Sequence, residues 1–338
     1  MIARSAGALL LLLWGAGGAG CAFDSDCGCQ GDADAGEVAQ GTDAALDQVP
    51  GDTLQPGELS GLCPYDTRLG GFSATIGPQY SFVEGKVGIG VLPSTVLDVV
   101  TTEGTCTLYR RPSLACQPPC TSQQTCDRGN QCIPFPYNQD LGAVTVKGLA
   151  VPVSMNALPP GKNYSATEVP RQLFNPGDPI LLEAPATGPF GAFSLDGDGV
   201  APLEDVPAST IVQENLALTL TWTADPTAQG RTQVDLKLSI DQHGSSPLSL
   251  ECSFPDSGSG TVPVTLINQL LQSGVTGYPN GSLTRRSADS VLVTQGCIDF
   301  SVYDRKDLTV RVAGYTPCKK QEDCPQGLTC NTLLEMCQ

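Results

Sequence analysis

The sequence predicts a mainly β protein with two β-sandwich-like domains, two small disulfide-rich modules and a disordered acidic N-terminal linker. Glycine and proline account for 38 and 27 of the 338 residues, which favours turns between short strands. Apolar and polar residues alternate along several stretches, as in strands with one buried face. Eight of the 15 cysteines fall into two compact groups, which predicts the two modules.

The first 20 residues have the layout of a secretory signal peptide. Arg4 precedes an apolar run that contains Leu9 to Leu13, and small residues follow the run up to Cys21. The run from Ala6 to Trp14 is shorter than the roughly 20 residues that a membrane-spanning helix needs. We therefore expect residues 1–20 to be cleaved and the rest of the chain to lie outside the cytoplasm.

The stretch Gly18-Ala19-Gly20-Cys21 resembles the lipobox of secreted bacterial lipoproteins, in which a small residue precedes a cysteine. The resemblance implies that Cys21 is lipidated, becomes the mature N-terminus and anchors the protein in a membrane. It also implies a location at the outer membrane or cell surface of a bacterium. An ordinary signal peptide cleaved nearby would instead leave Cys21 to pair with Cys27 or Cys29.

Residues 21–61 are predicted to form a disordered, acidic linker after the lipidated cysteine. Nine acidic residues and no Lys or Arg lie between Ala22 and Ser60. Such a segment buries too little apolar surface to offset its conformational entropy, and its like charges extend it. The net charge of −17 argues against nucleic acid as a partner, because a nucleic-acid-binding protein needs a basic face.

Residues 62–207 are predicted to form the first β domain. Apolar residues alternate from Lys86 to Val91, and further strands are expected at Phe72–Ile76, Leu97–Val100, Thr105–Tyr109, Ala143–Val146, Ile180–Glu183 and Phe193–Leu195. A cysteine-rich insert, residues 113–134, interrupts these strands. It has too few apolar residues for a core of its own, so we expect it to depend on its disulfides.

The run Asp196-Gly197-Asp198-Gly199 in this domain resembles part of a calcium-binding loop. An EF-hand loop needs an oxygen ligand at its fifth position and a glutamate at its twelfth, where this chain has Val200 and Pro207. A β-turn with solvated acids is therefore the favoured interpretation. A calcium site at Asp196 and Asp198 is the alternative.

Residues 208–315 are predicted to form a second, immunoglobulin-like β-sandwich with one short helix. Alternating residues indicate strands at Leu216–Trp222, Val234–Ile240, Leu248–Phe254, Ile298–Val302 and Leu308–Val312, with a break across Asp304 to Asp307. A helix is expected to begin at Pro263 and to bury a face made of Val264, Ile267, Leu270 and Leu271. We expect this helix to cover the core of the sandwich.

Residues 316–338 form the second cysteine-rich module and repeat the insert. Gln124-Thr125-Cys126-Asp127 is similar to Leu328-Thr329-Cys330-Asn331, and one further cysteine follows each run. The spacing resembles the four-cysteine modules, EGF-like or Dickkopf-like, of secreted bacterial lipoproteins. The resemblance implies an extracellular display protein and names no ligand.

The cysteines divide by region into groups within which we expect disulfides. Cys27 and Cys29 lie in the linker, and the two β domains supply the pairs Cys63–Cys106 and Cys252–Cys297. In each module four cysteines allow three connectivities; we favour first to third and second to fourth, which gives Cys116–Cys126, Cys120–Cys132, Cys318–Cys330 and Cys324–Cys337. Zinc binding is the disfavoured alternative, since only Cys116 and Cys120 have a spacing typical of zinc ligands.

No catalytic residue, metal or other cofactor is predicted. His243 is the only histidine and is expected in a solvated turn, while Asp256 to Gly260 resembles the nucleophile loop of trypsin-like proteases without their other motifs. Tyr164 and Tyr278 are candidates for stacking on sugars, and Trp222 is expected in the core.

The function predicted from the sequence is that of a membrane-tethered, extracytoplasmic display protein without catalytic activity. It is expected to act by protein binding or as a surface structure, with the membrane as one partner through the lipid anchor and an extracellular protein or glycan as another. A carbohydrate-binding surface module and, less favoured, a secreted hydrolase are the alternatives.

Overall fold

A computed structural model describes residues 54–338 except residues 78, 229 and 245. The predicted signal peptide, Cys21, the pair Cys27 and Cys29 and most of the predicted linker lie outside the described residues. Strands make up 44% of the described residues and helices 5%, so the mainly β class is confirmed.

The largest sheet has ten strands in the order β3-β4-β15-β14-β17-β18-β1-β2-β9, with β12 beside the end of β18. Its strands are β1 (Arg68–Ile76), β2 (Ser81–Val87), β3 (Asp98–Glu103), β4 (Cys106–Arg110), β9 (Tyr164–Ala166), β12 (Ser209–Val212), β14 (Gln233–Ser239), β15 (Leu248–Pro255), β17 (Asn280–Val293) and β18 (Gly296–Val312). β18 pairs in parallel with β1 and β12 and antiparallel with β17.

The remaining elements form small sheets and one helix. A four-stranded sheet contains β7 (Val144–Lys147), β8 (Val153–Met155), β10 (Pro179–Ala184) and β11 (Phe193–Asp198). The short pairs are β13 (Leu218–Thr221) with β16 (Ser259–Val262), β5 (Gln124–Cys126) with β6 (Cys132–Pro134), and β19 (Cys330–Asn331) with β20 (Met336–Cys337). The helices are α1 (Val264–Gln272) and the 3-10 turns η1 (Pro93–Thr95) and η2 (Gln321–Asp323).

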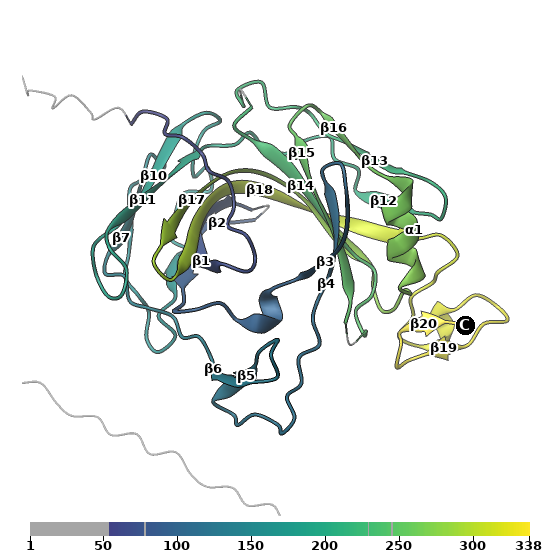
Figure 1. Cartoon of the computed structure of the whole chain (residues 1–338). Coiled ribbons are helices and arrows are strands. Elements are labelled where there is room, and N and C mark those ends of the chain that lie inside the picture. Colours follow the sequence, from purple (N-terminus) through teal and green to yellow (C-terminus); the bar gives the residue numbers. More distant parts are fainter. Residues whose placement is uncertain (1–53, 78, 229, 245) are drawn as a thin grey trace, which may run out of the picture. The chain divides into compact units, whose positions relative to one another are not determined.

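Two hydrophobic cores lie on one face of the large sheet, which we call the covered face. On β18, Ile298 to Val302 contribute alternate residues to a first core with the four-stranded sheet, and Leu308 to Val312 contribute alternate residues to a second core with β13, β16 and α1. Both sets of core residues have even numbers in one continuous strand, so they point to the same side. Figure 1 shows the two covering layers, with β7, β10 and β11 in one and β13, β16 and α1 in the other.

The structure corrects the predicted division into domains 62–207 and 208–315. The large sheet draws strands from both ranges, because β3 and β4 pair next to β15 and β1 pairs next to β18. The expected break at Asp304 to Asp307 is also absent, and β18 continues through it as a 17-residue strand. Asp304 remains inside the fold because its carboxylate accepts a hydrogen bond of 2.6 Å from the backbone N–H of Leu203.

β17 holds a buried arginine between the two cores. Arg285 is 1% exposed and lies on the covered face, between Leu283 of the second core and Val291 beside the first. Its guanidinium donates twice to the Asp256 carboxylate, at 2.7 and 3.0 Å, and also to three backbone carbonyls, those of Ala201, Pro202 and Thr223. The five N–H groups of the guanidinium thus all have acceptors, which offsets the cost of burying the charge.

The predicted disordered linker does not extend to Gly61. The backbone N–H groups of Ser60 and Gly61 donate to Asp289 and to the carbonyl of Ala288, both on β17. The carbonyl of Gly57 accepts a hydrogen bond of 2.7 Å from Arg231. Backbone groups of this segment therefore find partners on the large sheet and beside it, although the segment has few apolar side chains.

The two disulfides of the large sheet differ from the expected Cys63–Cys106 and Cys252–Cys297. The structure joins Cys63 to Cys297 and Cys106 to Cys252. Cys106 on β4 lies directly opposite Cys252 on β15, on the covered face. Cys297 precedes Ile298 and so lies on the other face of β18, where Cys252 cannot reach it.

Within each module the disulfides join the first cysteine to the third and the second to the fourth, the order favoured from the sequence. The pairs are Cys116–Cys126, Cys120–Cys132, Cys318–Cys330 and Cys324–Cys337.

The predicted buried face of the helix α1 needs one correction. Its buried residues are Leu266, Ile267 and Leu270, while Val264 is 38% exposed. Pro263 precedes the helix as the N-cap, so the helix begins at Val264 and not at Pro263.

Replacement of Arg285 by alanine is expected to lower the free energy of unfolding by about 3–5 kcal/mol, because it leaves a buried Asp256 carboxylate without its partner. Chemical denaturation followed by circular dichroism measures the change. Arg305→Ala is the matched control: Arg305 is 55% exposed and pairs with an exposed Asp307, so its loss is expected to cost less than about 1 kcal/mol. Equal losses in the two variants would contradict this assignment.

The bridges are expected to be reduced in an order set by burial. Cys120, Cys132 and Cys324 are partly exposed, whereas Cys106 and Cys252 are 0% and 3% exposed. Mild reductant with iodoacetamide, followed by peptide mapping, should therefore label the module cysteines first. The unfolded protein serves as the control in which all cysteines label together, and early labelling of Cys106 would refute the buried pairing.

Candidate functional site

The second face of the large sheet, which neither core occupies, carries a polar groove made of three adjoining cavities. The first, of about 620 Å³, lies over β1, β2, β9 and β18. The second, of about 420 Å³, lies over β14, β15 and β17, and the third, of about 630 Å³, lies toward the ends of β14 and β15. Arg68 lines both the first and the second cavity, and Tyr65 and Lys237 line both the second and the third.

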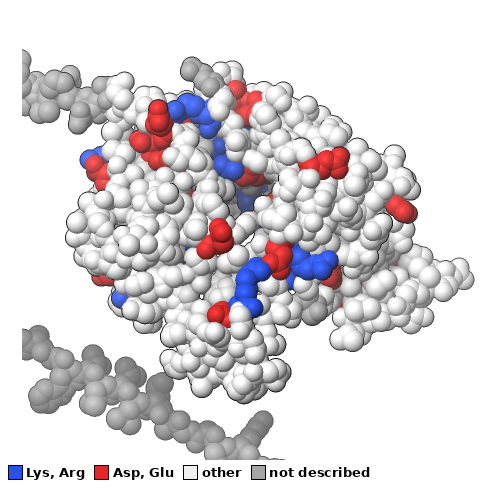
Figure 2. All heavy atoms as spheres, viewed as in Figure 1, with Lys and Arg blue, Asp and Glu red and all other residues white. Residues whose placement is uncertain are grey.

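The alternation of the strands places polar side chains along this groove. Successive residues of a strand point to opposite faces, so the residues between the core positions of β1, β14, β15, β17 and β18 point into the groove. They include Ser73, Asp235, Lys237, Glu251, Ser253, Thr284, Arg286, Asp299, Ser301 and Tyr303. In Figure 2 basic and acidic side chains lie close together around the hollow of this view.

Three ion pairs fix the orientation of charged side chains in the groove. Arg68 binds Asp299 through two nitrogens, each 2.9 Å from a carboxylate oxygen. Lys237 lies 2.7 Å from Glu251 across β14 and β15. Arg286 on β17 forms an ion pair with Asp235 on the neighbouring strand β14. These three cations are thus neutralised by neighbouring carboxylates, whereas Lys86 and Arg111, which also line the groove, form no ion pair with a described residue.

Two groove acids have further hydrogen bonds. The Tyr65 hydroxyl donates to Glu251 at 2.6 Å, and burial, followed by the nearby Glu251 charge, raises the pKa of the Tyr65 phenol. The Asp299 carboxylate accepts a bond of 3.2 Å from the backbone N–H of Cys63. Burial raises the pKa of Asp299, and the Arg68 charge opposes that shift.

The first cavity also has two exposed charges that form no ion pair with a described residue. Glu84 and Lys86 lie two residues apart on β2, so both point into this cavity. Lys86 faces Gly71 on β1. An added Cβ at Gly71 would lie 2.2 Å from the Asp299 carboxylate. Glycine there leaves room for the Arg68–Asp299 pair, and Glu84 and Lys86 are available to a ligand.

The candidate calcium residues lie on a strand and not in a turn. Asp196 and Asp198 belong to the end of β11, and Asp198 is 6% exposed. Asp198 forms an ion pair with Arg231, and burial followed by the Asp289 charge raises the pKa of Asp196. The prediction of a β-turn with solvated acids is therefore wrong. The Arg231 charge beside Asp198 also opposes the binding of a cation at the alternative calcium site.

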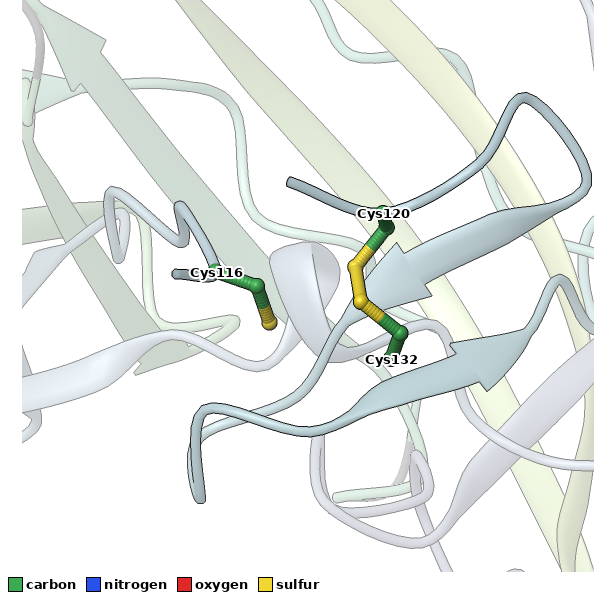
Figure 3. Close-up of side chains that lie close together, drawn as sticks. All are labelled: Cys116, Cys120 and Cys132. Atoms are coloured by element: carbon green, nitrogen blue, oxygen red, sulfur yellow. A yellow bond between two sulfur atoms is a disulfide. The ribbon is translucent and has the colours of Figure 1, made fainter. Parts of the chain in front are cut away.

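The cysteines of each module come close enough to resemble a metal site. The Sγ atoms of Cys116, Cys120 and Cys132 lie within 4.8 Å of one another, and the same holds for Cys318, Cys324 and Cys330. Figure 3 shows the Cys120–Cys132 disulfide with Cys116 next to it. Metal binding needs thiolates, and these sulfurs are all in disulfides, so the clusters are structural in this oxidation state.

Other residues singled out in the sequence serve the fold. Asp256 holds Arg285 and accepts a bond of 2.8 Å from the Trp222 indole, which confirms Trp222 in the core. His243 lies in a turn, as expected, but its Nε2 is 3.1 Å from a Glu335 oxygen of the C-terminal module. None of the three lines the groove.

Of the two tyrosines proposed to stack on sugars, Tyr164 is buried and Tyr278, which lies outside the groove lining, has a lysine beside its ring. Tyr164 is 1% exposed, and its hydroxyl accepts a bond of 2.7 Å from the backbone N–H of Leu141. The ammonium group of Lys319 lies 5.2 Å from the centre of the Tyr278 ring. The groove residues themselves were missed in the sequence, where they are only the polar members of alternating strands.

No protein family matches the chain, and the comparison with curated proteins gave no match. Among solved structures it is similar to the FN1–FN3 domains of chicken CNTN1, with 7% sequence identity over 69% of each chain and a TM-score of 0.17. A likeness of that size supports no inference about this chain's fold or function.

The six disulfides among the described residues indicate an extracellular or otherwise oxidising environment. Among the described residues no helix is long and apolar enough to cross a membrane.

Proposed function

We propose that this protein is a non-catalytic, extracytoplasmic binding module, tethered to a membrane through a lipid on Cys21, which binds an extracellular protein or glycan in the polar groove. The observation that carries the proposal is the continuity of the three cavities over the uncovered face of one large sheet. Concave sites with a few oriented polar groups are typical of ligand binding.

The ion pairs of the groove support binding because they hold its side chains in place before a ligand arrives. Arg68, Lys237 and Arg286 each contact a carboxylate on a neighbouring element. Side chains that are already ordered lose less conformational entropy when a ligand binds. These side chains stand on hydrogen-bonded strands of one sheet, and a site built on strands is more precise than one built on loops.

The chemistry of the groove favours binding over catalysis. Of the five acids that line it, four are engaged: Asp299, Asp235 and Glu251 by cations, and Asp241 by backbone N–H groups and a threonine hydroxyl. Only Glu84 is without such a partner among the described residues, and His243 lies outside the groove lining. A general acid–base mechanism would need a second poised group beside Glu84.

Photo-crosslinking in intact cells that produce the full chain tests the groove. Benzoylphenylalanine in place of Tyr303, which lines the first cavity, is expected to form a covalent adduct with the bound partner. The same residue in place of Leu333, which is 82% exposed in the C-terminal module, is the control. Adducts at position 333 but not at 303, or adducts at neither, would contradict the proposal.

The lipid anchor is tested by Cys21→Ala, a position outside the described residues. The unchanged protein is expected to partition into the detergent phase, because acyl chains contribute about 0.8 kcal/mol for each buried CH₂ group. The variant should be processed abnormally and should remain in the aqueous phase. Equal partition of the two proteins would remove the anchor from the proposal without affecting the groove.

A further inference from the structure

We infer that the ligand of the polar groove is a neutral glycan chain lying across the strands of the large sheet. This inference rests on the proposed function and narrows its ligand from an extracellular protein or glycan to one chemical class. It follows from what the groove offers to each class of ligand.

An extended peptide has little to bind in this groove. Peptides that add to a sheet do so at an edge, where free backbone N–H and C=O groups are available. The groove lies over β14, β15, β17, β18, β1, β2 and β9, and each of these strands except the three-residue edge strand β9 has a paired neighbour on both sides. Over most of its length the groove therefore offers side chains, and β9 is too short to pair with more than a few residues of a peptide.

A polyanion or an apolar ligand is also a poor match. Arg68, Lys237 and Arg286 are neutralised by bound carboxylates, so they attract a negative charge only weakly. Counting Lys86, Arg111 and Arg305 as well, the lining has six cations and five carboxylates, and this near balance is a poor match for a polyanion. The most exposed large apolar side chains, Leu292 and Leu333 at 80% and 82%, lie outside the groove lining.

A neutral sugar chain fits the same groups. Carboxylates accept hydrogen bonds from sugar hydroxyls, and ammonium and guanidinium groups donate to them, so a pair of opposite charges can bind two adjacent hydroxyls. Glu84 and Lys86 form such a pair of free groups in the first cavity, and Ser73, Ser301 and Asn163 add neutral donors and acceptors. The rings of Tyr303 and Tyr109 line the first and second cavities as surfaces for the apolar faces of sugars.

Binding of the purified full chain in detergent to an array of neutral hexasaccharides (gluco-, manno-, xylo- and galacto-series) tests the inference. The array also carries uronate hexasaccharides and acidic, basic and neutral peptides. We expect at least one neutral series to bind, with an affinity that changes less than about twofold between about 50 and 500 mM NaCl, because the ligand has no charge to screen.

A matched pair of double variants shows where binding occurs. Glu84→Gln with Lys86→Met should weaken binding of the neutral series at least about tenfold, because the variant loses its hydrogen bonds from two charged groups to the ligand. Lys147→Met with Glu183→Gln makes the same change of composition at an exposed pair on β7 and β10, outside the groove lining, and should alter affinity less than about twofold.

Three outcomes would overturn the inference: preferential binding of uronates, equal losses in the two double variants, or no neutral series bound. If the groove variant loses binding of a peptide and no neutral series binds, the glycan is wrong and the proposed binding function stands. If Tyr303 gives no crosslink and nothing on the array binds, the proposed function itself fails.

Discussion

The fold depends on a charge that is buried between two cores. Arg285 contacts Asp256 and the carbonyls of Ala201, Pro202 and Thr223, which come from segments far apart in the chain. If any of these acceptors were missing, burial of the Arg285 charge away from water would cost free energy. The segments that carry the acceptors must therefore reach their positions together. The interaction therefore fixes where the two covering layers meet on the large sheet, and apolar packing alone would not specify that position.

The same strand also supplies the groove, because neighbouring residues point to opposite faces. Arg285 reaches into the covered face, whereas Arg286 contacts Asp235 on the other face. The two arginines differ by one position and have different roles: the first orders the layers, and the second orients the lining of the groove. One long polar strand thus couples the architecture to the candidate binding surface.

The sequence predicted the features that depend on local pattern and missed those that depend on partners distant in the chain. Alternation located β14 and β15, and cysteine spacing located both modules. β17 was missed because its middle residues are polar on both faces, and only contacts with Asp256 and Asp235 make burial of Arg285 and Arg286 favourable. The groove could not be predicted for the same reason: the polar residues of a strand look equally solvated in sequence, whether or not they face a cavity.

The two long-range disulfides explain how an uncovered sheet face can remain ordered. Cys106–Cys252 fastens β4 to β15 from the covered side, and Cys63–Cys297 fastens the segment before β1 to β18 from the groove side. These bridges close loops of 146 and 234 residues, and in the chain-entropy account each stabilises the fold by about 5 kcal/mol. The second bridge also places the Cys63 N–H on Asp299, the carboxylate that holds Arg68. Covalent linkage therefore supplies, on the groove side, part of the order that a second core layer supplies on the covered side, and the groove remains open to a ligand.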